Sequence, residues 1–166
     1  MVIDAFPMLA IQAEGHSSDD LVRQVLDRSL DFVLLYGPPA TSELKSEKIG
    51  QLRLKMASTN PEANVKDALT GDYIYADWGS MFHAKKFGDQ IYSRVSVNLT
   101  HIALSLLQSR GGSAYFANST IETENWLHAV KRAPIFTRPV YVSYRVSNEN
   151  IEQVKEVVET LRGLEV

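Results

Sequence analysis

The side chains best suited to catalysis or metal binding are scattered along this sequence. The histidines are His16, His83, His101 and His128. No two of them are three or four residues apart, the spacing that places two metal ligands on one face of a helix. Cysteine is absent, which excludes disulfides, thiol nucleophiles and zinc–thiolate sites. We therefore expect no metal ion and no cofactor.

Sequence motifs that carry catalytic groups are also missing. The chain has no G-x-S-x-G, no H-E-x-x-H, no Walker phosphate loop and no G-x-G-x-x-G. Gly111 and Gly112 have the composition of a phosphate loop, but they follow an apolar helical pattern instead of opening one. They therefore predict the end of a helix. The residues favour a binding protein over an enzyme.

A different chemistry is available where a predicted strand gives way to a helix. Asp77, Trp78, Gly79 and Ser80 follow an apolar strand, so a hydroxyl and free backbone N–H groups would point off the edge of the sheet. Ligands of open α/β sheets bind at that edge. The alternative is that Asp77 caps the helix and Trp78 fills the core, and both interpretations can hold together.

Two other loops occupy the same kind of position. Asn98 and Thr100 follow one strand, and Tyr36, Gly37 and Pro38 follow another. Three loops with hydrogen-bond donors but no catalytic group predict a site for a small molecule. Donors at helix starts favour a polar or anionic ligand, because the helix dipole is positive there.

The elements that would position these loops alternate between strands and helices. Residues 8–13 predict a strand, and Ser17 predicts the N-cap of a helix with Asp20 at its third position. Residues 31–36 form a nearly continuous apolar run, typical of a strand buried on both faces in a parallel sheet. Together they predict a βαβ unit.

The alternation continues to the end of the chain. Further strands are predicted at residues 73–78, 92–97, 113–116 and 140–144. Asn98 and Thr100 are candidate caps for the helix that ends at Gly111. Apolar residues from Ile151 to Leu161 recur at helical spacing and predict a closing helix, with Gly163 as its C-cap. The fold class is α/β.

Charge and hydropathy limit the partners. The net charge is −3 and the pI about 5.8, which does not fit a surface that neutralises many phosphates. We expect no DNA binding by this chain alone. The sequence shows no signal peptide and no apolar stretch long enough for a membrane span, so we expect no membrane contact and a cytoplasmic protein.

Several blocks resemble one family in their order and spacing. They are FPMLAI (6–11), EGHS (14–17), LDFVL (30–34), GGSAYF (111–116) and RPVYVSYR (138–145). Together they resemble the effector-binding, or substrate-binding, domain of LysR-type transcriptional regulators. The resemblance covers essentially the whole chain, and YADWG (75–79) is similar to a narrower branch of that family.

The resemblance implies a two-subdomain type II periplasmic-binding-protein-like fold with a small effector in the cleft between the subdomains. Residues 1–52 plus 147–166 would form regulatory subdomain I, and residues 53–146 regulatory subdomain II. Two crossing strands would join them, near residues 48–55 and 143–148. Implied effector contacts are His16, Ser17, Tyr36, Gly37, Pro38, Asn98 and Thr100. The geometric argument adds Asp77, Trp78, Gly79 and Ser80.

Full-length members of that family begin with a winged helix-turn-helix, a linker helix, and a first strand and helix of the sensing domain. None of these precedes Pro7, so we expect an N-terminally truncated fold with the helix-turn-helix domain absent. The family also suggests a homodimer. Alternatives are a solute-binding protein of the same fold, or a truncated regulator that pairs with a full-length relative.

Overall fold

Two long strands, β2 (Leu44–Ser58) and β7 (Phe136–Arg145), each belong to both of the compact units into which the chain divides. The computed structural model describes residues 4, 6, 7, 11–78, 82–88, 91 and 93–162. Unit 1 is Met1–Gln51 with Pro139–Val166, and unit 2 is Leu52–Arg138. The second boundary precedes residues 143–148, because the last part of β7 already pairs with a strand of unit 1.

Besides its shares of β2 and β7, the described part of unit 1 contains helical segments and a complete strand. The segments are α2 (Ser18–Leu26), β1 (Phe32–Leu35), a 3-10 turn (Val146–Asn148) and α7 (Glu152–Arg162). Its strand order is β1-β7-β2. The predicted N-cap is confirmed, since the Ser17 side chain accepts a hydrogen bond from the Asp20 N–H at 3.2 Å.

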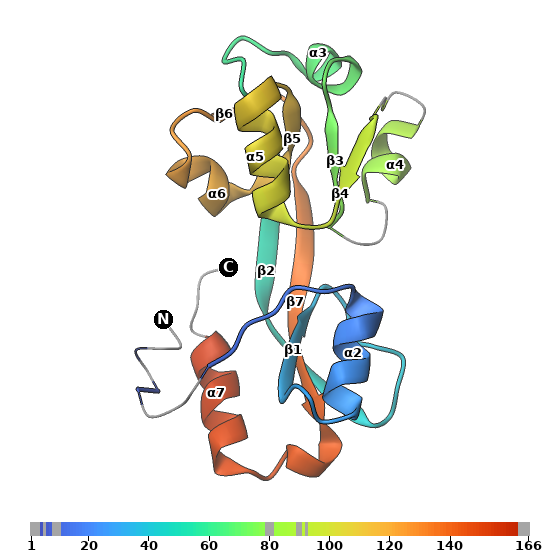
Figure 1. Cartoon of the computed structure of the whole chain (residues 1–166), viewed down its shortest axis with the longest axis vertical. Helices are drawn as coiled ribbons and strands as arrows, with labels where there is room; N and C mark the ends of the chain where they lie inside the picture. The colour runs from blue at the N-terminus through green and yellow to red at the C-terminus, as the bar shows by residue number, and fades with distance from the viewer. Residues whose placement is uncertain are drawn as a thin grey trace. The chain divides into compact units, whose positions relative to one another are not determined.

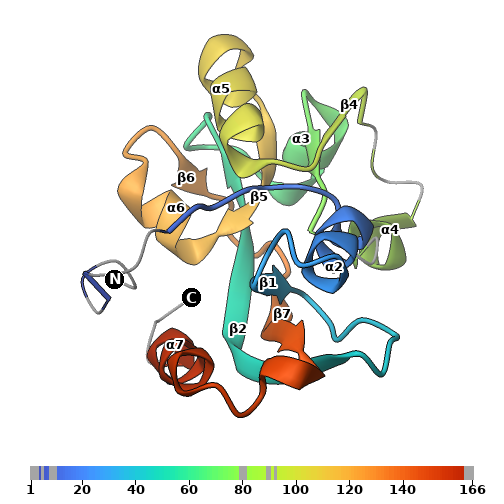
Figure 2. The ribbon, with the colours of Figure 1, turned by 60° about the horizontal axis from the view of Figure 1, so that its bottom comes forward.

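The core of unit 1 forms where α2 lies beside β1 (Figure 1), an adjacency that Figure 2 shows from another direction. Its fully buried members are Val25, Val33, Leu35 and Leu44. Half-buried residues pack around them: Leu21, Val22 and Leu26 of α2, and Leu30 of the connection that follows. The apolar period of the sequence therefore predicted the buried face of α2 correctly.

The βαβ unit predicted for the N-terminal region stays a prediction, and the pairing that the structure describes for its second strand is antiparallel. β1 pairs antiparallel with β7, with Phe32 opposite Tyr144 and Leu35 opposite Tyr141. Along β1 the burial alternates, and Leu34 is 51% exposed, so the strand is not buried on both faces. Residues 11–13 have no strand structure, and residues 8–10 lie outside the described residues.

Unit 2 combines a parallel strand pair with antiparallel pairing on β2. Its elements are α3 (Val65–Thr70), β3 (Ile74–Ala76), α4 (Phe82–Phe87), β4 (Val95–Val97), α5 (Thr100–Arg110), β5 (Ser113–Ala117), α6 (Asn118–Thr123) and β6 (His128–Ala129). β3 and β4 are parallel, and a parallel bridge joins Tyr73 to Ser113. β5 and β6 pair antiparallel with β2. β4 is shorter than predicted, because Ser93 and Arg94 lie outside the strand.

The end of α5 confirms the interpretation of the double glycine. Gly111 is the C-cap, with φ 76°, and its N–H donates to the carbonyl of Leu107 at 2.7 Å. Gly112 has φ 119°, and a Cβ there would lie 2.1 Å from the backbone oxygen of Asp72. Glycine is required because a side chain would displace the backbone at Asp72.

The closing helix α7 forms as the apolar period predicts. Val154 and Val158 are buried, and Leu161 is half-buried. Ile151 precedes the helix and is 43% exposed, so its predicted place on the buried face is wrong. Gly163, the predicted C-cap, lies outside the described residues.

Candidate functional site

In unit 1, His16 and Ser17 lie directly before α2, and both are exposed. His16 Nε2 lies 2.9 Å from a carboxylate oxygen of Glu14, and hydrogen bonds from His16 and Gln12 lower the pKa of Glu14. The Ser17 hydroxyl donates to the Asp20 carboxylate at 2.6 Å while it caps the helix. The side chain of Ser17 is therefore engaged by its own helix.

Tyr36, Gly37 and Pro38 form the turn directly after β1. Tyr36 and Gly37 are half-buried, and a Cβ on Gly37 would meet nothing within 4 Å. α2 packs against β1, and a short connection joins the end of the helix to the start of the strand. The turn and the residues before α2 therefore lie at the same end of unit 1.

In unit 2, the parallel register brings two predicted loops together. Ala76 is opposite Val97, and the Asp77 N–H donates to the carbonyl of Val97 at 2.7 Å. Asp77 and Asn98 therefore leave neighbouring strands at the same carboxyl edge, as the sequence predicts. Both are exposed, and Thr100, the first residue of α5, is half-buried.

The start of α5 differs from the prediction. Its N-cap is Leu99, and no side-chain cap hydrogen bond is present, so capping by Asn98 or Thr100 is wrong. The Leu99 carbonyl accepts from the N–H groups of Ile102 and Ala103 at 3.1 and 3.3 Å. The N–H groups of Thr100 and His101 precede these bonds and have no acceptor within the helix. They can bind a negatively charged group.

Trp78 is a core residue of unit 2. It is 8% exposed, and its Nε1–H donates to the backbone carbonyl of Tyr115 at 2.9 Å. Of the two interpretations of this motif, the structure supports the core role of Trp78. Gly79 and Ser80 lie outside the described residues, and the helix that follows, α4, begins at Phe82.

Two arginines that no sequence pattern singles out, Arg94 and Arg110, line a pocket of unit 2. They are isolated basic residues, and only the fold brings them to one place. The described residues contain no group of three or more histidines and carboxylates arranged to hold a metal ion. No helix in the same part of the chain is long and apolar enough to cross a membrane.

Two α/β units whose long strands β2 and β7 run through both define a type II periplasmic-binding-protein-like regulatory fold. The chain belongs to the LysR substrate binding domain family, whose model matches residues 3–164. The resemblance seen in the sequence is thereby confirmed.

Curated relatives support the same assignment. The HTH-type transcriptional regulator HdfR of Yersinia enterocolitica is 23% identical over 164 residues, which cover 92% of this chain and 56% of the relative. HdfR of Salmonella schwarzengrund is 23% identical over 155 residues, covering 92% of this chain and 55% of the relative. The chain thus spans a little over half the length of these relatives.

Solved structures share the fold at low identity. The reduced regulatory domain of Pseudomonas aeruginosa OxyR has a TM-score of 0.74 and 12% identity, covering 97% of this chain and 86% of that one. The Synechocystis CcmR regulatory domain in complex with 2-PG has a TM-score of 0.72 and 12% identity, with the same coverage of both chains.

Proposed function

We propose that this chain binds a small polar or anionic effector and passes that signal to the rest of a cytoplasmic bacterial transcriptional regulator. The family match over residues 3–164 carries the proposal. The fold likeness to a regulatory domain solved in complex with 2-PG supports a small molecule as the effector. We assign no catalytic role to the chain.

In unit 2, the effector contacts we propose follow β3 and β4 along the chain. They are Asp77, Trp78, Gly79, Ser80, Asn98 and Thr100. The free N–H groups at the start of α5 favour a negative group on the effector. Asp77 is exposed beside them, and its carboxylate would repel a negative group placed close to it.

In unit 1, we propose that His16, Ser17, Tyr36, Gly37 and Pro38 contact the effector. Because the Ser17 hydroxyl already caps α2, the backbone N–H groups of the first helical turn are the donors there. The open space at Gly37 and the exposed ring of Pro38 leave room for an apolar part of the effector.

Calorimetric titration of this chain with a panel of small carboxylates and phosphate esters tests the proposal. For a compound that binds, Thr100→Ala should weaken affinity by about 1–3 kcal/mol, the cost of losing a hydrogen bond in a desolvated site. Thr100→Ser keeps the hydroxyl and is the matched control. Equal affinity in wild type, Thr100→Ala and Asn98→Ala would contradict the assignment in unit 2.

Ser17→Ala separates a ligand role from a structural one in unit 1. Loss of the N-cap should lower the free energy of unfolding by about 1 kcal/mol. Effector affinity should change little at a temperature where the variant is folded, because the hydroxyl is bonded to Asp20. A tenfold loss of affinity, at unchanged stability, would instead show that the hydroxyl binds the effector directly.

DNA binding belongs, in this proposal, to sequence outside the matched domain, since the curated relatives are named HTH-type regulators and are longer. With a net charge of −3, the chain alone should not bind duplex DNA specifically. Fluorescence anisotropy that showed tight, sequence-dependent binding would refute this. Assembly into a homodimer is part of the same proposal, and sedimentation equilibrium tests it.

A further inference from the structure

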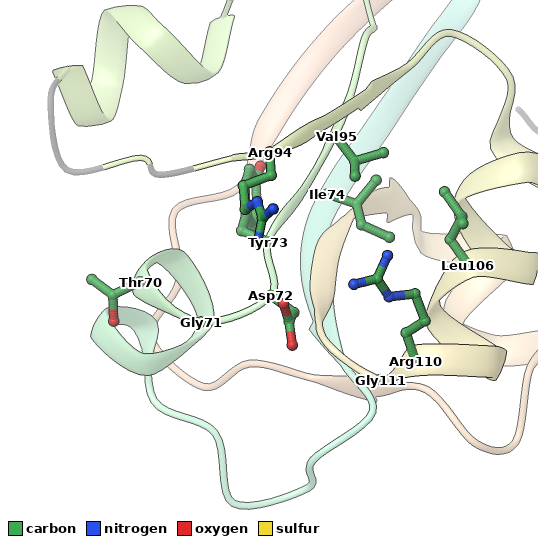
Figure 3. A pocket seen from close by; sticks show the side chains of 10 residues that line it. All are labelled: Thr70, Gly71, Asp72, Tyr73, Ile74, Arg94, Val95, Leu106, Arg110 and Gly111. Atoms are coloured by element: carbon green, nitrogen blue, oxygen red, sulfur yellow. The ribbon is translucent and has the colours of Figure 1, made fainter.

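Unit 2 contains a pocket that none of the predicted effector residues lines. Its volume is about 490 Å³, within the usual size of small-molecule sites. Among its lining residues are Asp72, Ile74, Arg94, Val95, Leu106 and Arg110. Figure 3 shows the side chains of Arg94 and Arg110 extending toward the start of β3 from opposite sides.

The pocket lies at the opposite ends of the elements that carry the candidate effector residues. Arg94 directly precedes β4, whereas Asn98 directly follows it. Arg110 is the last residue of α5 and Thr100 the first, and that helix is about 15 Å long. A ligand small enough for the pocket would not reach Thr100, so the two places are separate sites.

The pocket carries two positive charges and one negative charge that do not pair with one another. In the described part of the chain, no carboxylate oxygen lies within 4.0 Å of the guanidinium of Arg94 or Arg110. Asp72, on the same pocket, is exposed. The charges therefore remain available to groups of a ligand, and two guanidinium groups in one pocket favour an anion.

The backbone beside each arginine is fixed. Next to Arg94, the Ser93 hydroxyl accepts from the Tyr75 N–H at 3.1 Å and lies 2.9 Å from the carbonyl of Tyr73. These bonds tie the segment before β4 to β3. On the other side, Ser113 N–H donates to the carbonyl of Asp72 at 3.1 Å, which fixes the turn that follows Arg110.

The rest of the lining includes apolar side chains. Ile74 is 6% exposed, and Val95 and Leu106 are half-buried, so these side chains present part of their surface to the pocket. Burial of this apolar surface favours the binding of a ligand that has an apolar body as well as a charged group.

We propose that this pocket is a second ligand site, which binds a small organic anion. A carboxylate or phosphate group lies between Arg94 and Arg110, and an apolar body packs on Ile74 and Leu106. Asp72 accepts a hydrogen bond from a hydroxyl or amine of the ligand. The chain would then respond to two ligands, one at each end of α5.

Phenyl phosphate and phenylacetate are suitable probes, since each joins an anionic group to an apolar ring, and benzyl alcohol is the neutral comparison. In amide NMR titrations of the whole chain, we expect saturable shifts at Asp72, Arg94 and Gly111. Arg94→Gln and Arg110→Gln should each weaken binding roughly tenfold or more, since each removes a charge-assisted contact. The two probes together show whether phosphate or carboxylate is preferred.

Arg53→Gln is the matched control, because Arg53 is an exposed arginine of unit 2 on β2, away from the pocket. It should leave the affinity unchanged. Shifts that do not saturate for either anion, equal affinity in Arg110→Gln and Arg53→Gln, or equally tight binding of benzyl alcohol would each overturn the proposal. The substituted arginines are exposed, so the variants should keep the wild-type amide spectrum elsewhere.

Discussion

The indole Nε1–H of Trp78 donates a hydrogen bond to the backbone carbonyl of Tyr115 at 2.9 Å. Trp78 follows β3, and Tyr115 is the central residue of β5, completely buried. The bond therefore fixes the chain just beyond the end of β3 to β5. The loop that begins at Asp77 starts from a firmly held position.

Trp78→Phe removes this donor and leaves a buried carbonyl without it. We expect the free energy of unfolding to fall by about 0.5–1.5 kcal/mol, the net contribution of a typical intramolecular hydrogen bond. Trp126→Phe is the control, because Trp126 is half-buried and its partner is the side chain of Glu124, which water can solvate. Urea denaturation measures both. Equal losses in the two variants would contradict the special role of Trp78.

Gly112→Ala tests the close approach of the turn after α5 to Asp72. A Cβ there would lie 2.1 Å from the Asp72 oxygen, and φ is 119°, so we expect a loss of about 2 kcal/mol or more. Gly37→Ala should change stability by less than about 0.5 kcal/mol, because its Cβ meets nothing within 4 Å. Thermal unfolding compares them, and a tolerated Gly112→Ala would refute the packing described here.

Arg145→Met tests whether the Arg145 side chain stabilises the backbone carbonyl groups at and after the end of α2. Its Nη1 donates to the carbonyls of Val25 at 2.6 Å and Leu30 at 3.3 Å, and its side chain is 15% exposed. Removal should cost about 1–3 kcal/mol in chemical denaturation. Arg23→Met breaks only the exposed pair with Asp20 and should cost less than about 0.5 kcal/mol. A smaller loss for Arg145→Met than for Arg23→Met would be the contrary result.

Two buried tyrosines predict alkaline instability. Burial raises the pKa of Tyr73 and of Tyr115 above the ordinary value. Because the folded chain holds these phenols protonated, their stabilising effect is complete below about pH 10, the pKa in the unfolded chain, and is lost as pH rises toward the folded pKa. The free energy of unfolding should therefore fall above about pH 10, and less steeply in Tyr73→Phe. An equal slope in wild type and Tyr73→Phe would contradict this.

Local signals in the sequence predicted the helices well. Ser17 and Asp20 form the predicted cap, Gly111 ends α5, and the apolar period of α7 gives its buried face. Each of these depends on residues that are close in sequence. The family assignment depended instead on the order of several weak blocks, and the match over residues 3–164 confirms it.

Strand pairing could not be predicted from such local signals in the sequence. The apolar run at Phe32–Leu35 fits a parallel or an antiparallel neighbour equally, and the partner, β7, lies more than a hundred residues later in the chain. The pocket of Arg94 and Arg110 depends likewise on the register between β3 and β4, which no local pattern encodes. In the sequence, Trp78 was compatible with a place in the wall of a ligand site and with a place in the core. Its hydrogen bond to the Tyr115 carbonyl, which the structure shows, supports the place in the core.

The two units differ in how their residues are distributed along the chain. Unit 2 is one continuous segment, Leu52–Arg138, whereas unit 1 needs both Met1–Gln51 and Pro139–Val166. During synthesis, α2 and β1 emerge before unit 2, but β1 has no β7 to pair with until Phe136–Arg145 has been made. We expect unit 2 to complete its core before the segment of α2 and β1 gains its partner strand. The segment of α2 and β1, although it is made before unit 2, is thus among the last to become stable.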